Sequence, residues 1–197
     1  MSDETRIGDW LQVHSGHALW PLDPRPEEIR IGDVAQGLSH LCRFGGQCRV
    51  FYSVAQHSVF VAEICAELAR DLDPEAQRLN TLAGLLHDAP EAFIADVPRP
   101  VKNHLPPFHE IEARLWDVCA RKWGLADPES GEPLYDVDLV RCGDDTALIT
   151  EKRDLMAVEM RWGLEDHLTP LARRVEPVPP EEARAMFLAE FERLHRL

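Results

Sequence analysis

Apolar residues recur with helical spacing in one segment of this chain after another, and each segment begins with a helix-start signal. Ser53 precedes the segment that reaches about Arg70, with Gln56 three residues later as in a capping box. The other segments begin near Asp33, Asp73–Pro74, Pro107, Asp136 and Pro180, and strand-like alternation is nearly absent. The sequence therefore predicts an all-α fold, a bundle of helices.

The 197 residues are expected to form a single domain, residues 1–197, with a core at about 33–160. An extended, proline-punctuated segment precedes this core, and a C-terminal helix follows it. No apolar run approaches the roughly 20 residues of a membrane span, and the first residues do not resemble a signal peptide. The chain is therefore expected to be cytoplasmic, without a membrane partner.

The net charge of −14 disfavours binding to long nucleic acid, which requires a basic surface. A small anionic substrate held by a local cation is compatible with it. The five cysteines are an odd number without a C-x-x-C pair, which predicts free thiols rather than a disulfide framework or a cysteine zinc site.

One stretch concentrates charge where an apolar helix ends: LAGLLHDAPEAFIADVPRP, residues 82–100. His87 and Asp88 stand side by side at the end of the helical pattern, and Glu91 and Asp96 follow among prolines. An isolated His-Asp pair carries little information, because this composition produces one by chance. Burying such groups costs several kcal/mol each unless they are paired or bound to a metal. A cation is the expected compensation.

Two other helices supply matching side chains. His57 lies in the first turns of the preceding helix, which should pack antiparallel to the helix that ends at His87. Asp144 and Asp145 interrupt the apolar pattern of a third helix. Two imidazoles and two carboxylates form a mixed nitrogen and oxygen set, which suits Mn, Fe, Co, Zn or Mg with open positions. The interior of a helical bundle is a common place for such a site.

The order of these residues, His57, His87-Asp88 and Asp144, resembles the HD-domain metal-dependent phosphohydrolase superfamily. HDAPEAFIADVPRPVK resembles the corresponding segment of bacterial 5′-deoxynucleotidases. LCRFGGQCRVFYSVAQHS resembles a region of cyanophage dATP triphosphohydrolase and its relatives. The resemblance covers about residues 15–160, and residues 161–197 have no match in it.

This resemblance implies one divalent metal ion, whose identity among Mn, Co, Zn, Fe and Mg stays open, held by His57, His87, Asp88 and Asp144. Asp144 is favoured over Asp145 because Glu151 and Asp154 then fall at the offsets of the family. Glu91 and Asp96 match its two catalytic acids, with the base and the acid unassigned. The expected substrate contacts are Arg43 and Lys102 to phosphate and Phe44 beside the nucleoside, where the nucleotidases have Trp.

The expected activity is hydrolysis of (deoxy)nucleotides by attack of water at the α-phosphorus, which releases a nucleoside. A 5′-nucleotidase would use monophosphates and a triphosphohydrolase would use dNTPs, and both stay open. The alternative is a non-catalytic HD-fold sensor that binds a nucleotide. An HD-type di-iron oxygenase would need additional histidine ligands. Because relatives assemble, a homo-oligomer is also expected.

Overall fold

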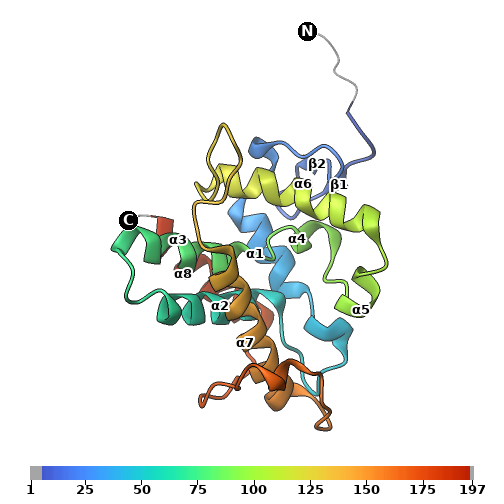
Figure 1. Ribbon diagram of the computed structural model, residues 1–197. Helices are drawn as coiled ribbons and strands as arrows, with labels where there is room; N and C mark the ends of the chain where they lie inside the picture. The colour runs from blue at the N-terminus through green and yellow to red at the C-terminus, as the bar shows by residue number, and fades with distance from the viewer. Residues whose placement is uncertain (1–5, 196–197) are drawn as a thin grey trace.

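The computed structural model describes residues 6–195 and confirms the all-α fold (Figure 1). The long helices are α1 (Ile31–His40), α2 (Val54–Leu68), α3 (Pro74–Leu86), α6 (Pro106–Lys122), α7 (Val137–Leu155) and α8 (Pro180–His195). Two one-turn helices, α4 (Glu91–Ile94) and α5 (Arg99–Lys102), lie in the proline-rich stretch that was expected to be a loop. Near the N-terminus, β1 (Leu11–Gln12) and β2 (Ala18–Leu19) form a small antiparallel hairpin.

Helix starts follow the local signals of the sequence. Ser53, Asp73 and Asp136 are N-cap residues whose side chains accept backbone N–H groups of the first turn. Of the two hydrogen bonds of the capping box expected at Ser53, the one from the Gln56 N–H to the Ser53 side chain is present, and the expectation of the other is wrong. The Gln56 side chain does not return to the cap but donates to the carbonyl of Glu176, 2.7 Å away. It therefore ties α2 to the chain that leads into α8.

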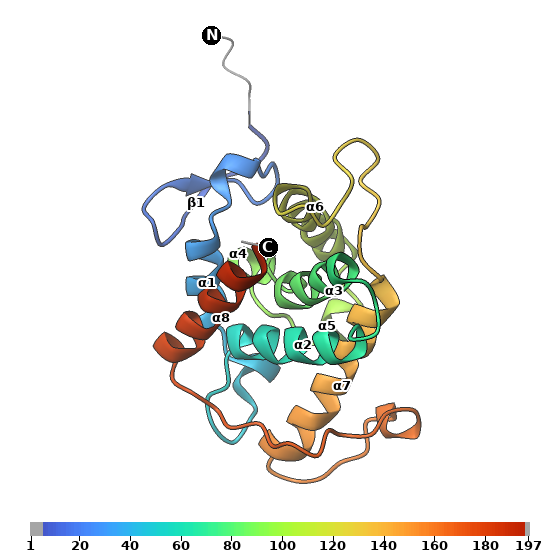
Figure 2. The same ribbon diagram turned by 90° about the vertical axis from the view of Figure 1, so that its left-hand side faces the viewer.

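The bundle is built around the antiparallel pair α2 and α3. Helix α7 crosses this pair on one side, and α8 packs on α1 and α2 on the other (Figure 2). After α7, the chain passes around the lower end of the bundle as residues 156–179 before it enters α8 (Figures 1 and 2). Helices α1 and α8, from opposite ends of the chain, therefore pack together on one side of the central pair.

Two glycines allow α3 and α7 to approach α2 closely. A Cβ atom added at Gly84 of α3, or at Gly143 of α7, would lie 2.8 Å from the Cys65 sulfur of α2. Both distances are shorter than any normal contact, so a larger residue would force the helices apart. Because Gly143 precedes Asp144 and Gly84 lies one turn before His87, this close packing sets the positions of the polar side chains beside α2.

The buried core extends beyond residues 33–160, the range expected from the sequence. Leu19 of the hairpin and Phe187 of α8 are both fully buried in the same hydrophobic cluster as Leu82 and Leu85 of α3. The apolar stripe of α8 covers α1 and α2, so the C-terminal helix is part of the packed interior.

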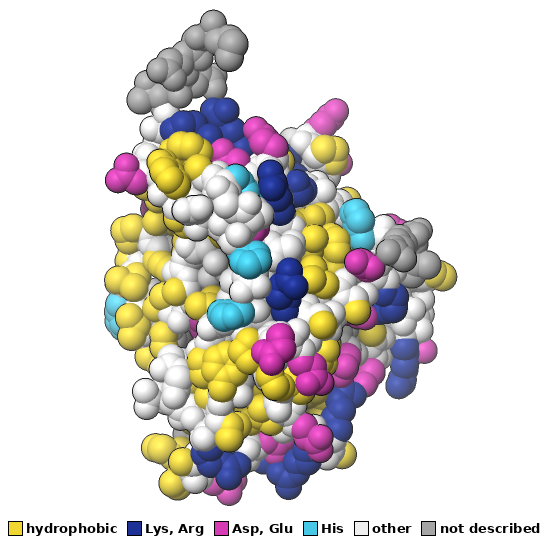
Figure 3. Space-filling model, turned by 180° about the vertical axis from the view of Figure 1, so that it is seen from behind, with side chains coloured by type: hydrophobic (Ala, Val, Ile, Leu, Met, Phe, Trp, Pro, Cys, Tyr) yellow, Lys and Arg dark blue, Asp and Glu magenta, His cyan; other side chains and the backbone are white. Residues whose placement is uncertain are grey.

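No helix within residues 6–195 combines the length and the apolar character that a membrane span requires. On the face seen in Figure 3, Lys and Arg side chains are interspersed with Asp and Glu rather than gathered into one basic area. Acidic side chains on this face accord with the net charge of −14.

Candidate metal centre

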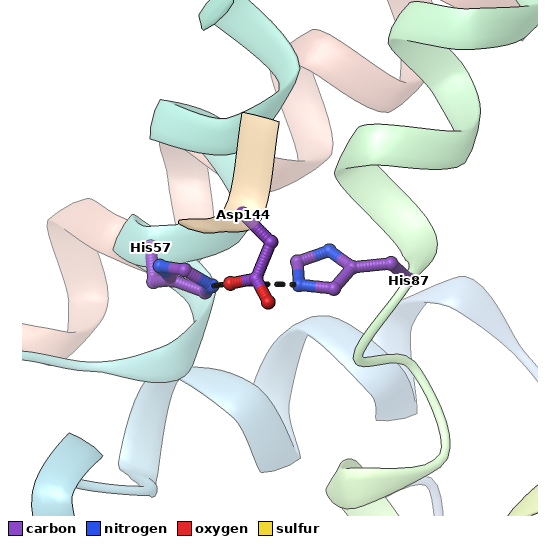
Figure 4. Close-up of side chains that lie close together, drawn as sticks. All are labelled: His57, His87 and Asp144. Atoms are coloured by element: carbon purple, nitrogen blue, oxygen red, sulfur yellow. Dashed lines mark ion pairs between the residues drawn. The ribbon is translucent and has the colours of Figure 1, made fainter. Parts of the chain in front are cut away.

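Three helices bring His57, His87 and Asp144 together. His57 lies in the first turn of α2, His87 directly follows α3, and Asp144 lies in α7. One ligand atom from each residue lies within 4.8 Å of the others. The Asp144 carboxylate stands between the two imidazoles, with Oδ1 3.2 Å from His57 Nε2 and 3.9 Å from His87 Nε2 (Figure 4). Its neighbour Asp145 instead pairs with Arg99, at 3.4 Å.

Asp88 adds a second carboxylate to this cluster. Its Oδ2 atom lies 3.2 Å from Nε2 of His87 and 3.6 Å from Nε2 of His57. The four side chains that the family resemblance singles out as ligands therefore occupy one place, at the end of the bundle where α2 begins and α3 ends.

Both histidines direct one ring nitrogen into the cluster and use the other for a hydrogen bond. His57 Nδ1 pairs with the Glu151 carboxylate at 2.7 Å, and His87 Nδ1 pairs with the Gly84 carbonyl at 2.8 Å. Neither Nε2 atom has a hydrogen-bond partner among the described residues, although both are buried. Two free nitrogens opposite two carboxylates, with the second ring nitrogens already bound, fit a divalent ion.

The protonation of the cluster reflects its crowded charges. Burial and the Arg43 guanidinium lower the pKa of His57, but the Glu151 and Asp144 carboxylates outweigh both and raise it to about 9. Burial raises the pKa of Asp144, but the two imidazoles outweigh it and hold that pKa below its usual range. Without a metal, a proton on the His57 imidazole thus supplies positive charge that a cation could supply instead.

The two further acids of the sequence motif line the adjoining cavity. Burial, together with the nearby carboxylates of Asp88 and Asp96, raises the pKa of Glu91 to about 10. Burial also raises the pKa of Asp96, although the Arg43 guanidinium opposes the shift. Asp96 follows Ala95, a non-glycine residue with φ of 73°, so a strained turn directs this acid back toward the cavity. Carboxyl groups with raised pKa values are suited to proton transfer.

Arg43 and Lys102 are two cations at the site that form ion pairs with its acids. Arg43 is buried, with Nη1 3.6 Å from Asp88 Oδ2 and Nε 3.2 Å from Glu151 Oε2. Burial lowers the pKa of Arg43, but these carboxylates outweigh it, so the guanidinium stays charged. The Lys102 amine lies 3.6 Å from the Glu91 carboxylate and also pairs with Glu112. Each cation therefore already has acidic neighbours.

A cavity of about 590 Å³ opens beside the cluster, a size typical of small-molecule sites. It is lined by the acids Asp88, Glu91, Asp96 and Asp144, by the cations Arg43, Arg99 and Lys102, and by the apolar side chains Phe44, Val97, Pro98, Pro100, Leu148, Trp162 and Leu164. His57 and His87 adjoin it through the two aspartates that they contact. The structure thus brings all nine residues expected from the sequence to one site.

Three contributions were missed by the sequence reasoning. Glu151 had been noted only for its offset from Asp144, whereas it is the carboxylate that binds His57. Arg99 had no assigned role, yet it lines the cavity and lies 3.5 Å from Asp144. Trp162 belongs to the segment that the family resemblance left unmatched. The basic character of Arg99 in an acidic motif was a usable signal, but nothing local to Trp162 places it at the site.

The chain is similar to one protein-family model and to two uncharacterized bacterial proteins. The model of the HD domain family matches residues 54–119, which include His57, His87, Asp88, Glu91 and Asp96. The chain is 34% identical to the uncharacterized protein YfdR of Escherichia coli, over 95% of this chain and 97% of YfdR. It is 30% identical to an uncharacterized protein of Rhodobacter capsulatus, over 91% of this chain and 92% of that protein.

Proposed function

The chain belongs to the HD-domain superfamily, whose members are in general metal-dependent phosphohydrolases, and we propose that it hydrolyses nucleotides at the α-phosphorus. The observation that carries the proposal is the pair of buried Nε2 atoms of His57 and His87, which have no hydrogen-bond partner among residues 6–195 and face Asp88 and Asp144 at the edge of a cavity that also holds acids and cations. A site for a cation, a proton acceptor and a phosphate-binding guanidinium are the parts that phosphoryl hydrolysis requires.

His57, His87, Asp88 and Asp144 are the proposed metal ligands. A divalent ion bound by them would supply Lewis-acid polarisation of a phosphoryl oxygen, worth several kcal/mol. The donor set of two nitrogens and two carboxylates is compatible with Mn, Co, Zn, Fe or Mg. Arg43 would neutralise a second phosphoryl oxygen through its planar guanidinium, which binds oxyanions in a two-pronged manner.

Glu91 and Asp96 are the proposed proton-transfer residues. In the reaction one of these carboxyl groups accepts a proton from the attacking water, and one donates a proton to the leaving 5′ oxygen of the nucleoside. The crowding that raises the pKa of Glu91 to about 10 would be relieved by a cation at the neighbouring cluster, because positive charge favours the ionised carboxylate. Lys102, 3.6 Å from Glu91, acts in the same direction and would be a second contact to phosphate.

The proposal is tested by a product assay on protein stripped of metal. Mn, Co, Mg or Zn is added back singly, each dNMP and dNTP is offered, and nucleoside, phosphate and triphosphate are quantified. We expect metal-dependent release of nucleoside, with inorganic phosphate as the co-product of a nucleotidase and triphosphate as that of a triphosphohydrolase. Asp88→Ala should abolish the release and lower the bound metal per chain.

Glu91→Gln separates an enzyme from a sensor. Removal of a general acid or base costs about 100- to 10,000-fold in rate, so turnover should fall by that factor while bound metal stays unchanged. Glu110→Gln, on the exposed side of α6, is the matched control and should retain full activity. Protein that holds one metal per chain and hydrolyses no nucleotide would contradict the proposal and favour a nucleotide-binding sensor.

A further inference from the structure

Trp162 is an exposed aromatic residue at the cavity, beyond the part of the chain that the sequence motif explains. Its side chain is 42% exposed, and it lines the same cavity as Asp88 and Glu91. It lies opposite Phe44, with the two ring centroids 6.1 Å apart and the ring planes inclined at 59°. Two aromatic walls thus meet at an angle and leave ring surface open to the cavity.

The position of Trp162 is set by a buried lysine of α7. The backbone N–H of Trp162 lies 3.3 and 3.2 Å from the two carboxylate oxygens of Glu165. Glu165 also pairs with the amine of this lysine, Lys152. The amine lies over the indole at 5.6 Å from the ring centroid, a cation–π contact, and the Lys152 side chain is only 8% exposed. Lys152 and Asp144 belong to the same helix, so one rigid element fixes both the cluster and the indole.

Phe44 is held on its side of the cavity at a conformational cost. Its φ of 58° lies in the left-handed region, which is unfavourable for a residue other than glycine. Such strain is retained where the surrounding structure enforces it, and it is common at functional sites. The Arg43 guanidinium pairs with Asp88, one of the proposed metal ligands, and lies 5.3 Å from the Phe44 ring centroid. From the proposed metal ligands outward, the order is therefore the Arg43 guanidinium, the Phe44 ring and the Trp162 ring.

This order matches the parts of a nucleotide, from phosphate outward to base. On the basis of the proposed function, we infer that Trp162 and Phe44 form the nucleobase subsite and that Trp162 is its specificity-determining residue. Apart from the indole of Trp162, the described polar side chains that line the cavity are acids and cations, and none is Ser, Thr, Asn or Gln. The two rings therefore offer the base a stacking surface, which tolerates different bases and favours the larger purines.

The kinetic test compares wild type with Trp162→Ala and Trp162→Phe, each loaded with metal. The substrates are a purine deoxynucleotide, a pyrimidine deoxynucleotide and 2-deoxyribose 5-phosphate, which lacks a base. Trp162→Ala should raise KM for the purine substrate about tenfold, raise it less for the pyrimidine, and leave KM and kcat for the base-free ester unchanged. Trp162→Phe keeps a ring and should retain most of the purine affinity. Val158→Ala, at a residue 72% exposed on the same segment, is the matched control.

A second readout does not depend on turnover. A purine nucleoside without phosphate should quench the tryptophan emission of the wild type, and Trp162→Phe should lose that quenching while its thermal unfolding stays unchanged. An equal loss on the base-free ester, or unaltered purine kinetics together with unaltered quenching, would overturn the inference. If the wild type hydrolyses no nucleotide, the proposed function fails, and the nucleoside titration alone decides whether the base subsite exists.

Discussion

The Glu151 carboxylate lies 2.7 Å from Nδ1 of His57, while Nε2 of the same ring faces Asp144. Glu151 is fully buried and also accepts the Tyr52 hydroxyl at 2.9 Å. Burial raises the pKa of Glu151, but Arg43 and His57 outweigh it and hold that pKa below its usual range. An ionised carboxylate at Nδ1 keeps a proton there and presents the lone pair of Nε2 to a metal.

Glu151→Gln should therefore lower metal affinity about 10- to 100-fold, because an amide orients and polarises the imidazole less than a carboxylate does. The measurement is metal retention in competition with a chelator, with thermal unfolding of the metal-free protein recorded in parallel. Glu159→Gln, an exposed position on the next segment, is the control and should match the wild type. Unchanged retention in a folded Glu151→Gln protein would show that Glu151 does not orient the ligand.

Gly37 of α1 makes room for the helix that carries Glu91. A Cβ atom at this position would lie 2.6 Å from the carbonyl oxygen of Ala92 and 2.8 Å from its Cβ. Gly37→Ala should force α4 away from α1, lower the free energy of unfolding by about 1–3 kcal/mol, and reduce kcat because Glu91 is displaced. Urea unfolding and steady-state kinetics measure the two effects.

Gly32→Ala in the same helix is the matched control. A Cβ atom at Gly32 would have no neighbouring atom of residues 6–195 within 4 Å, and alanine is the better helix former by up to about 1 kcal/mol. This variant should be as stable as the wild type or more stable, with unchanged kcat. If Gly37→Ala behaved in the same way, the close approach of α1 and α4 would not matter for the site.

Arg43 has a structural role besides its proposed contact with phosphate. Removal of one partner from a buried ionic group leaves the other charges uncompensated, which costs about 3–5 kcal/mol. In metal-free protein, Arg43→Ala should lower the free energy of unfolding by about that amount, because Asp88 and Glu151 lose their cation. The loss should be smaller with metal bound, since the ion then neutralises Asp88.

Urea unfolding of metal-free and metal-loaded protein checks this expectation. Arg141→Ala, at an exposed position of α7, is the control and should change stability by no more than about 0.5 kcal/mol. An equal loss in both metal states would contradict the electrostatic explanation. Loss of activity in Arg43→Ala alone is then insufficient evidence for phosphate binding, and a comparison with Arg43→Lys, which keeps the charge, becomes necessary.

Local signals explain why much of the fold could be predicted. Helix α3 begins at Pro74 and α7 after Asp136, as the sequence indicated, because a cap and the first turn involve only neighbouring residues. The partner of the Gln56 side chain could not be predicted in this way. Its carbonyl acceptor, Glu176, lies 120 residues along the chain, and such contacts depend on the tertiary arrangement.

The same division applies to the site. The convergence of His57 and His87 followed from the packing of consecutive helices, and their ring centroids lie 5.3 Å apart. The choice between Asp144 and Asp145 needed family spacing, because adjacent helical positions differ by about 100° in direction and only one can face the histidines. Trp162 was not predictable, since it reaches the cavity through the course of residues 156–179 and lacks a local pattern.

Asp154, at the end of α7, binds the segment of residues 156–179 that leads to α8. Its contribution to the stability of the fold should depend on pH. Its carboxylate accepts the Val175 N–H at 2.9 Å and pairs with Arg153 and Arg174 at 2.7 and 2.6 Å. Burial raises the pKa of Asp154, but these donors outweigh it and lower the pKa to about 2. Since the unfolded chain titrates near the ordinary value of about 3.9, the native state is the weaker base.

A folded pKa below the unfolded one means that stabilisation is fully present above about pH 4 and is lost as the pH falls toward about 2. Asp154→Asn should lower the free energy of unfolding at pH 6 by about 2 kcal/mol, and this difference from the wild type should shrink as the pH falls. Urea unfolding of both proteins from pH 6 to pH 2.5 measures it, and the difference cancels the titration of other acids. Asp71→Asn, whose side chain is 88% exposed, should show no such trend. A difference that stayed constant across this range would mean that Asp154 acts through packing rather than through its charge.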